Sequence, residues 1–154
     1  MRRKEREITE NELITEIISS ADVCRIAFAD GNTPYIVTMN FGYSGGEKPG
    51  IYFHCAPEGR KIEMMKKNSH VCFQMDTDHR LTSGARGCDW GMKYKSVVGY
   101  GRLSVVEKDE ERKEGLNLIM NQYGGSGKYD YDQKIFARTT ILHLEITEIS
   151  AKEA

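Results

Sequence analysis

Most hydrophobic residues of this chain fall in short runs with strand-like patterning, and turn-forming residues separate the runs. The pattern predicts strands at 23–29, 35–41, 51–56, 71–75, 93–106 and 139–149. The turn-rich segment 30–34 separates the first two strands, and the glycine-containing segment 42–50 follows the second as a hairpin loop. We therefore expect the first three strands to form an antiparallel meander.

Other segments carry hydrophobic residues at helical spacing. Thr9 and Glu12 form a capping-box sequence in front of an apolar stripe, which predicts a short amphipathic helix near the start of the chain. A second, brief helix is expected to begin close to Pro57 and to end at Asn68. A third is expected over 109–123, before a polar loop at 124–132.

Gly99 and Gly101 lie inside the longest predicted strand, where glycine commonly marks a bulge or a barrel corner. Strands of this kind with a few short helices predict a mainly β, α+β fold, a β-barrel decorated by helices. The sequence shows no internal repeat and no linker. We therefore expect a single domain over 1–154, with an N-terminal helix in 1–21, a barrel core in 22–106, and a helix and the last strand in 107–154.

The near-zero net charge of the chain argues against partners that bind through overall charge. Lys and Arg number 22 and Asp and Glu number 23, so the net charge is -1 and no overall field draws the molecule to nucleic acid or to an anionic membrane. The basic start is followed by Glu5 and Glu7, and no run approaches the roughly 18 apolar residues that cross a bilayer. We expect a cytoplasmic protein with neither nucleic acid nor membrane as a partner.

The cysteines show neither metal-binding nor redox spacing. Cys24, Cys55 and Cys72 sit in apolar runs, so we expect reduced thiols that fill the core. Cys88 lies in a polar, glycine-rich stretch and is expected to be exposed. The sequence predicts no metal site.

The strongest local signal is a turn after the third strand that delivers Arg60 and Lys61 to the first turn of a helix. Free backbone N–H groups at a helix start carry partial positive charge, and with a guanidinium and an ammonium they make a cradle for a phosphate monoester. Paired basic residues on a short helix are also typical of a solvated surface. Both interpretations stay open from the residues alone.

A second signal is the strand around 35–40, which polar residues interrupt. Thr38 and Asn40 share one face with Ile36, whereas Val37 and Met39 point the other way. Such polar side chains need partners. The partners are either loop backbone or a heterocycle with donors and acceptors along its rim.

A third segment puts Trp90, Tyr94 and Ser96 at the entrance of the glycine-containing strand. Together these segments resemble the superfamily of split barrels that bind flavin mononucleotide (FMN), which includes pyridoxamine phosphate oxidase, and within it the nitroimidazole-resistance (Nim-type) branch. The resemblance rests on four sequence segments: PYIVTMNFGY at 34–43, IYFHCAPEGRK at 51–61, VCF at 71–73 and WGMKYKSVVGYG at 90–101.

The resemblance implies a role for each matching position. The strand from Val37 to Asn40 would lie along the isoalloxazine, and the basic pair would hold the FMN phosphate. Ser96 would approach the cofactor from across a subunit interface. The residues expected to bind the cofactor are Val37, Thr38, Met39, Asn40, His54, Cys55, Arg60, Lys61, Tyr94 and Ser96.

His54 is the candidate catalytic residue. It matches a histidine that the Nim branch places beside the flavin, for which a direct part in chemistry has been proposed. The alternative is a hydrogen-bonded strand histidine with a structural role. His70, His79 and His143 are expected to be structural or exposed.

The function that the resemblance implies is an FMN-dependent oxidoreductase that reduces a small electron-poor substrate such as a nitro-aromatic. It would be a homodimer with its flavin sites at the interface. Other hypotheses are a non-enzymatic protein that binds or senses flavin or haem on the same fold, and a scaffold without cofactor.

Two departures limit this assignment. The chain lacks the C-terminal Trp and Arg segment with which pyridoxamine phosphate oxidases grip their substrate, so that activity is not assigned. No G-x-G-x-x-G follows a strand, so any NAD(P)H would visit the flavin transiently.

Overall fold

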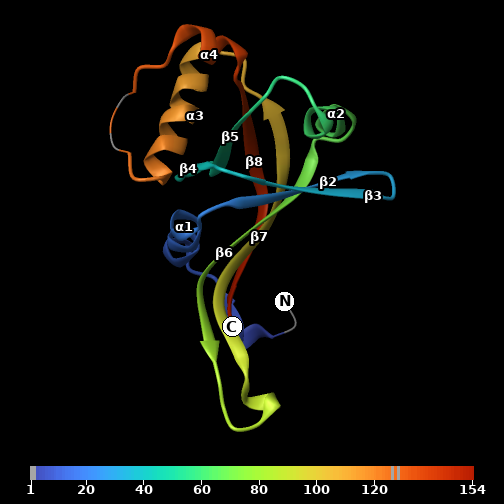
Figure 1. The fold of residues 1–154 in the computed structure, drawn as a ribbon, viewed down its shortest axis with the longest axis vertical. Coiled ribbons are helices and arrows are strands. Elements are labelled where there is room, and N and C mark those ends of the chain that lie inside the picture. The colour runs from blue at the N-terminus through green and yellow to red at the C-terminus, as the bar shows by residue number, and fades with distance from the viewer. Residues whose placement is uncertain (1–2, 126, 128) are drawn as a thin grey trace.

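The fold is described from a computed structural model, which covers residues 3–125, 127 and 129–154. An eight-stranded antiparallel sheet dominates it, in the order β3-β2-β6-β7-β8-β5-β4, and β1 pairs with β8 (Figure 1). The strands are β1 (Glu7–Ile8), β2 (Cys24–Asp30), β3 (Thr33–Met39), β4 (Gly42–Ser44), β5 (Gly50–Cys55), β6 (His70–Thr82), β7 (Gly91–Val105) and β8 (Thr140–Glu153). The helices are α1 (Asn11–Ser20), α2 (Arg60–Lys67), α3 (Asp109–Gln122) and α4 (Gln133–Arg138), with 3-10 turns at Lys4–Arg6 and Gly87–Asp89.

The sheet curls until its two edges approach each other. Strands β3 and β4 lie at opposite ends of the strand order, yet only Asn40 and Phe41 separate them in the chain. The three residue steps from Met39 to Gly42 span at most about 11 Å, so a flat sheet could not hold both strands. The result is an open barrel with a split between β3 and the edge formed by β4 and the end of β5, in agreement with the split barrel that the resemblance implies.

The main core fills the inside of this curled sheet. Its largest fully buried side chains include Phe28, Phe41, Phe53 and Phe73, which come from four separated segments of the chain. The helix α1 contributes Ile17 and other residues of its apolar stripe to the same cluster. Burial of so many large side chains is the main favourable term for this fold.

A second, smaller cluster holds α3 against the outside of β4 and β5. It contains Tyr52, Val106, Ile119 and Ile141. The approach is close because glycines stand at the contact: a Cβ on Gly42 would collide with the backbone of Leu118 and Ile119. Helix α3 therefore lies directly on the end of the sheet, beside β5 (Figure 1).

The structure corrects two sequence predictions near the N-terminus. Thr9 does not cap the first helix, because the N-cap is Glu10, whose carboxylate accepts a hydrogen bond from the Thr9 N–H. The first three strands do not form a meander: β5 pairs with β4 and β8, not with β3. The buried Phe41 takes the chain across the split to β4, so β5 pairs on the far side of the split from β3.

Most of the remaining elements agree with the sequence except in extent, but β1 was not expected, and β4 lies in the segment 42–50 that was predicted as a hairpin loop. The predicted helices at 57–68 and 109–123 correspond to α2 and α3, but the six-residue α4 was not expected. Strands β6 and β7 are longer than predicted and form a hairpin that extends beyond the rest of the sheet (Figure 1). No helix of the described residues is long and apolar enough to cross a membrane.

The cysteines follow the prediction only in part. Cys24 is fully buried and Cys88 is exposed, as expected, but Cys55 and Cys72 are half-buried. All four are free thiols. Cys55 packs against the edge of the core, whereas Cys72 alternates with the buried Val71 and Phe73 and so lies on the outer face of β6.

At the predicted bend, β7 faces a bulge in β8, where Thr147 is the extra residue. The register between the two strands shifts between Tyr100 and Gly101. A Cβ on Gly99 would lie 2.6 Å from the carbonyl oxygen of Glu148, and one on Gly101 would collide with the carbonyl oxygen of Glu145. The glycines allow the two strands to come together where the barrel bends.

We expect Gly101→Ala to lower the free energy of unfolding by about 1–3 kcal/mol, because the added methyl group meets backbone that cannot move aside. Urea unfolding at one fixed protein concentration measures the change. Gly87→Ala is the matched control, since a Cβ there meets nothing within 4 Å. Equal unfolding midpoints for the two variants would contradict this account of the bulge.

Candidate functional site

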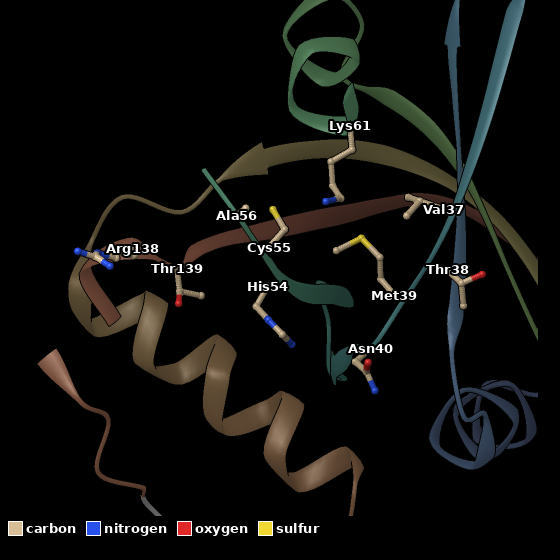
Figure 2. Close-up of a pocket in the computed structure, with 10 residues that line it drawn as sticks. All are labelled: Val37, Thr38, Met39, Asn40, His54, Cys55, Ala56, Lys61, Arg138 and Thr139. Carbon is tan, nitrogen blue, oxygen red and sulfur yellow. The ribbon is translucent and has the colours of Figure 1, made fainter. Parts of the chain in front are cut away.

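A hollow of about 520 Å³ lies at the split of the barrel, and we call it the first hollow (Figure 2). Strand β3 forms one side, the end of β5 forms the other, and the start of α2 and the end of α4 complete it. Its lining residues are Val37, Thr38, Met39, Asn40, His54, Cys55, Ala56, Lys61, Arg138 and Thr139. The site thus gathers segments that are about 100 residues apart in the chain.

The β3 side offers unpaired backbone groups. Strand β3 is an edge of the sheet and pairs only with β2, so alternate residues direct N–H and C=O groups away from the sheet. Thr38 and Asn40 are exposed, and in the described part of the chain neither side chain has a hydrogen-bond partner. Loop backbone is therefore not what they bind. This side of the hollow presents donors and acceptors in a row.

The lining of the first hollow contains two cationic side chains, Lys61 and Arg138. Lys61 enters the hollow and Arg138 lies at its rim, with its side chain directed away from Lys61 (Figure 2); the lining contains no carboxylate, and neither cation forms an ion pair within the described residues. Figure 2 shows Lys61 reaching from α2 into the space between Cys55 and Val37. The first amides of α2 also lack intrahelical partners and receive no side-chain cap. The hollow is therefore suited to an anionic group near Lys61.

The predicted basic pair separates in the structure. Arg60 does not line the hollow; its guanidinium lies over the ring of Tyr35, 4.6 Å from the ring centroid. Lys61 alone of the pair points inward.

The two β5 residues of the site differ in environment. Cys55 is half-buried, and burial raises the pKa of its thiol although the nearby Lys61 ammonium acts in the opposite direction. The thiol is therefore neutral at physiological pH. His54 is exposed and has no hydrogen-bond partner in the parts of the chain that the structure describes. Its imidazole points toward α3 (Figure 2).

Tyr94 and Ser96 lie elsewhere in the chain's own structure. They line a separate hollow of about 410 Å³ on the outer face of the sheet, together with Asp76 and His79. The imidazole Nε2 of His79 is 2.7 Å from the Asp76 carboxylate, and Lys152 lies over the Tyr94 ring. One chain therefore does not bring Tyr94 and Ser96 to His54, and their approach to the site from a second copy stays a prediction.

Sequence reasoning missed the α4 side of the hollow, which supplies Arg138 and Thr139. A local signal was present: the Asp132 carboxylate accepts hydrogen bonds from the Lys134 and Ile135 amides and so caps α4. Arg112 then fixes the end of the helix by donating to the carbonyl oxygens of Phe136 and Thr139.

Comparisons with known proteins find similar structures and a family. A protein of Bacteroides thetaiotaomicron, described as a candidate 5-nitroimidazole antibiotic resistance protein, is 29% identical, with a TM-score of 0.82 over 96% of this chain and 86% of that one. The flavocytochrome Anf3 of Azotobacter vinelandii matches with 15% identity and a TM-score of 0.80, over 100% of this chain and 72% of that one.

A FAD-binding protein of Mesorhizobium loti matches with 22% identity and a TM-score of 0.67, over 95% of this chain and 96% of that one. The similarity to the flavocytochrome and to the Mesorhizobium loti protein shows that this chain shares their fold. A comparison with curated proteins finds no match. The sequence model of the family described as pyridoxamine 5'-phosphate oxidase matches residues 10–153, and this chain therefore belongs to that family.

Proposed function

We propose that this protein is an FMN-dependent oxidoreductase that reduces a small electron-poor molecule such as a nitro-aromatic. The observation that carries the proposal is the first hollow: a cavity with two unpaired cations and no carboxylate, bordered by an edge strand with free backbone groups. Family membership and the flavin named for two similar structures support it.

The phosphate end of FMN fits the α2 side of the hollow. A phosphate monoester carries nearly two negative charges at neutral pH, and the Lys61 ammonium with the first amides of α2 offers charge-assisted hydrogen bonds. Arg138 adds a second positive charge from the opposite wall. We assign the phosphate to Lys61 in the first place, and Arg60 to a supporting role through its contact with Tyr35.

The ring system fits the β3 side. Flavin edges carry alternating donors and acceptors, and the edge backbone of β3 with the side chains of Thr38 and Asn40 can pair with them. Val37, Met39 and the neutral Cys55 thiol supply apolar contact for the ring faces. When bound, the flavin supplies the electron transfer; the chain binds it, orients it and excludes water.

We expect Lys61→Ala to raise the FMN dissociation constant by about 10- to 100-fold and to leave riboflavin affinity unchanged, because one charge-assisted hydrogen bond is worth about 1.5–3 kcal/mol and only FMN carries the phosphate. Flavin fluorescence titration measures both constants. Lys66→Ala, on the exposed side of the same helix, is the control, and Arg60→Ala should have a smaller effect. Equal losses for FMN and riboflavin would rule out the role of Lys61.

His54 is the residue placed to donate a proton to a reduced acceptor, because it lies at the end of β5 and lacks a partner in the described chain. We expect His54→Asn to slow reoxidation of reduced FMN by nitrobenzene about 100-fold or more, with FMN affinity within about twofold, as general acids contribute 10²–10⁴ in rate. Stopped-flow absorbance measures the rate, with His70→Asn as the control.

Two other outcomes of this experiment are informative. Weakened FMN binding with normal reoxidation would make His54 a cofactor-support residue. If nitrobenzene failed to reoxidise even the wild-type protein, the oxidoreductase proposal would fall and a binding role would replace it.

The outer face of the sheet supports assembly with a second copy. Ile36 on β3, Cys72 on β6 and Tyr100 on β7 lie in one row across the sheet, because the strand register connects them through β2. Ile36 is 65% exposed and Tyr100 is 42% exposed. Val98 is exposed on the same face. A second copy that covers this apolar surface would carry its Tyr94 and Ser96 toward the first hollow of its neighbour.

We expect light scattering at micromolar concentration to give the mass of a dimer. Val98→Glu should shift the mass toward the monomer and weaken FMN retention, because it places a charge in the apolar interface. Leu13→Glu, at an exposed leucine of α1, should remain dimeric, because α1 packs on the core inside the barrel and not on the outer face. A monomeric wild-type protein would refute the proposed assembly.

A further inference from the structure

A second hollow of about 350 Å³ adjoins the first and has a different character. It lies among α3, α4, the segment 130–132 and the end of β5. His54 and Thr139 line both hollows. The other lining residues of the second hollow are Leu116, Ile119, Met120, Asp130, Tyr131, Asp132, Ile135 and Phe136.

The walls of the second hollow are mostly apolar and aromatic. Ile135 is 69% exposed and Met120 is 41% exposed, although both are large hydrophobic residues. The rings of Tyr131 and Phe136 stack with centroids 6.4 Å apart. Exposed hydrophobic residues that gather in one concave place, unlike scattered ones, indicate a binding site.

Most polar groups of this lining already have partners within the protein. The Asp132 carboxylate caps α4, the Tyr131 hydroxyl donates to Asn117 at 2.8 Å, and the Thr139 hydroxyl donates to the Ile135 carbonyl oxygen at 2.9 Å. His54 and Asp130 are left without a hydrogen-bond partner in the described residues. A ligand in this hollow would therefore meet apolar walls, one available imidazole and the Asp130 carboxylate.

The walls are held in place before any ligand binds. The Arg112 guanidinium lies 4.1 Å from the Phe136 ring centroid and bonds the carbonyl oxygens at the end of α4. Helix α3 is fixed by its close approach to Gly42, and a Cβ on Gly115 would lie 2.6 Å from the Tyr52 ring. A preformed site loses less free energy on binding than one that must order itself.

We propose that the second hollow is the subsite for the acceptor, and that it takes a small neutral aromatic molecule whose polar end meets His54. This inference rests on the proposed function, in which the flavin occupies the first hollow. The volume lies at the low end of ligand pockets, about 300–1,000 Å³, which suits one substituted ring. The carboxylates of Asp130 and Asp132 disfavour an anionic acceptor.

The test titrates nitrobenzene into protein labelled with ¹³C at the methionine methyl groups, with and without FMN. We expect the Met120 methyl resonance, assigned with Met120→Leu, to shift on binding. Ile135→Asp should raise the nitrobenzene dissociation constant about tenfold, because the ligand loses apolar contact. Ile135 is exposed, so the fold should tolerate the change, and Ile135→Ala serves as a second, milder variant.

The matched control is Leu13→Asp, another exposed aliphatic residue, which should bind nitrobenzene as the wild type does. The anionic 4-nitrobenzoate should bind more weakly than nitrobenzene. An unshifted Met120 methyl, or an Ile135→Asp variant with unchanged affinity, would overturn the subsite even if nitrobenzene reoxidises the flavin. A shifted Met120 methyl with affinity lost in Ile135→Asp supports the subsite even if no flavin is reoxidised, and in that case the proposed function fails.

Discussion

The short crossing between β3 and β4 is the constraint on which the rest of the structure depends. Because only Asn40 and Phe41 join the two edges of the sheet, the sheet must curl, and its two edges must stay close without pairing. The Phe41 N–H donates to the Tyr123 hydroxyl, which itself donates to the Asp22 carbonyl oxygen. The end of α3 thereby holds the crossing in place.

That split explains why the first hollow is polar on one side and why α3 lies where it does. An edge strand facing a gap keeps unpaired backbone groups, which would be costly if they were buried without partners. Gly42, immediately after the crossing, lets α3 approach the end of the sheet closely. The same few residues therefore open the first hollow and set one wall of the second.

Local patterning was sufficient to predict most elements of the fold. The strand alternation, the α2 and α3 segments and the bend at the β7 glycines all depend on residues close together in sequence. The strand order did not follow, because the pattern of β5 says that it is buried but not which strand it pairs with. The short α4 was missed since its cap, Asp132, lies in a segment whose polarity predicts a loop.

The sequence predicted which segments form the candidate site but not all of the side chains that line it. The segments 37–40 and 54–61 do meet, as the resemblance implied, but neighbouring residues on a helix point about 100° apart, and here Lys61 lines the hollow while Arg60 lies over Tyr35. The sequence had no means to choose between them. Arg138 could not be found at all, because its position depends on α4 and on the Arg112 contacts that fix the end of that helix.

The two hollows differ in a way that suits two different ligands. The first carries two cations and a polar strand edge, whereas the second has apolar walls and carboxylates. An anionic, polar molecule would therefore bind preferentially in the first hollow, and a small neutral aromatic molecule in the second. His54 lies where the two meet and has no partner in the described chain that would hold it to either side. Under the proposed function, this position would let one imidazole reach both the flavin and the acceptor, as a proton transfer at the acceptor requires.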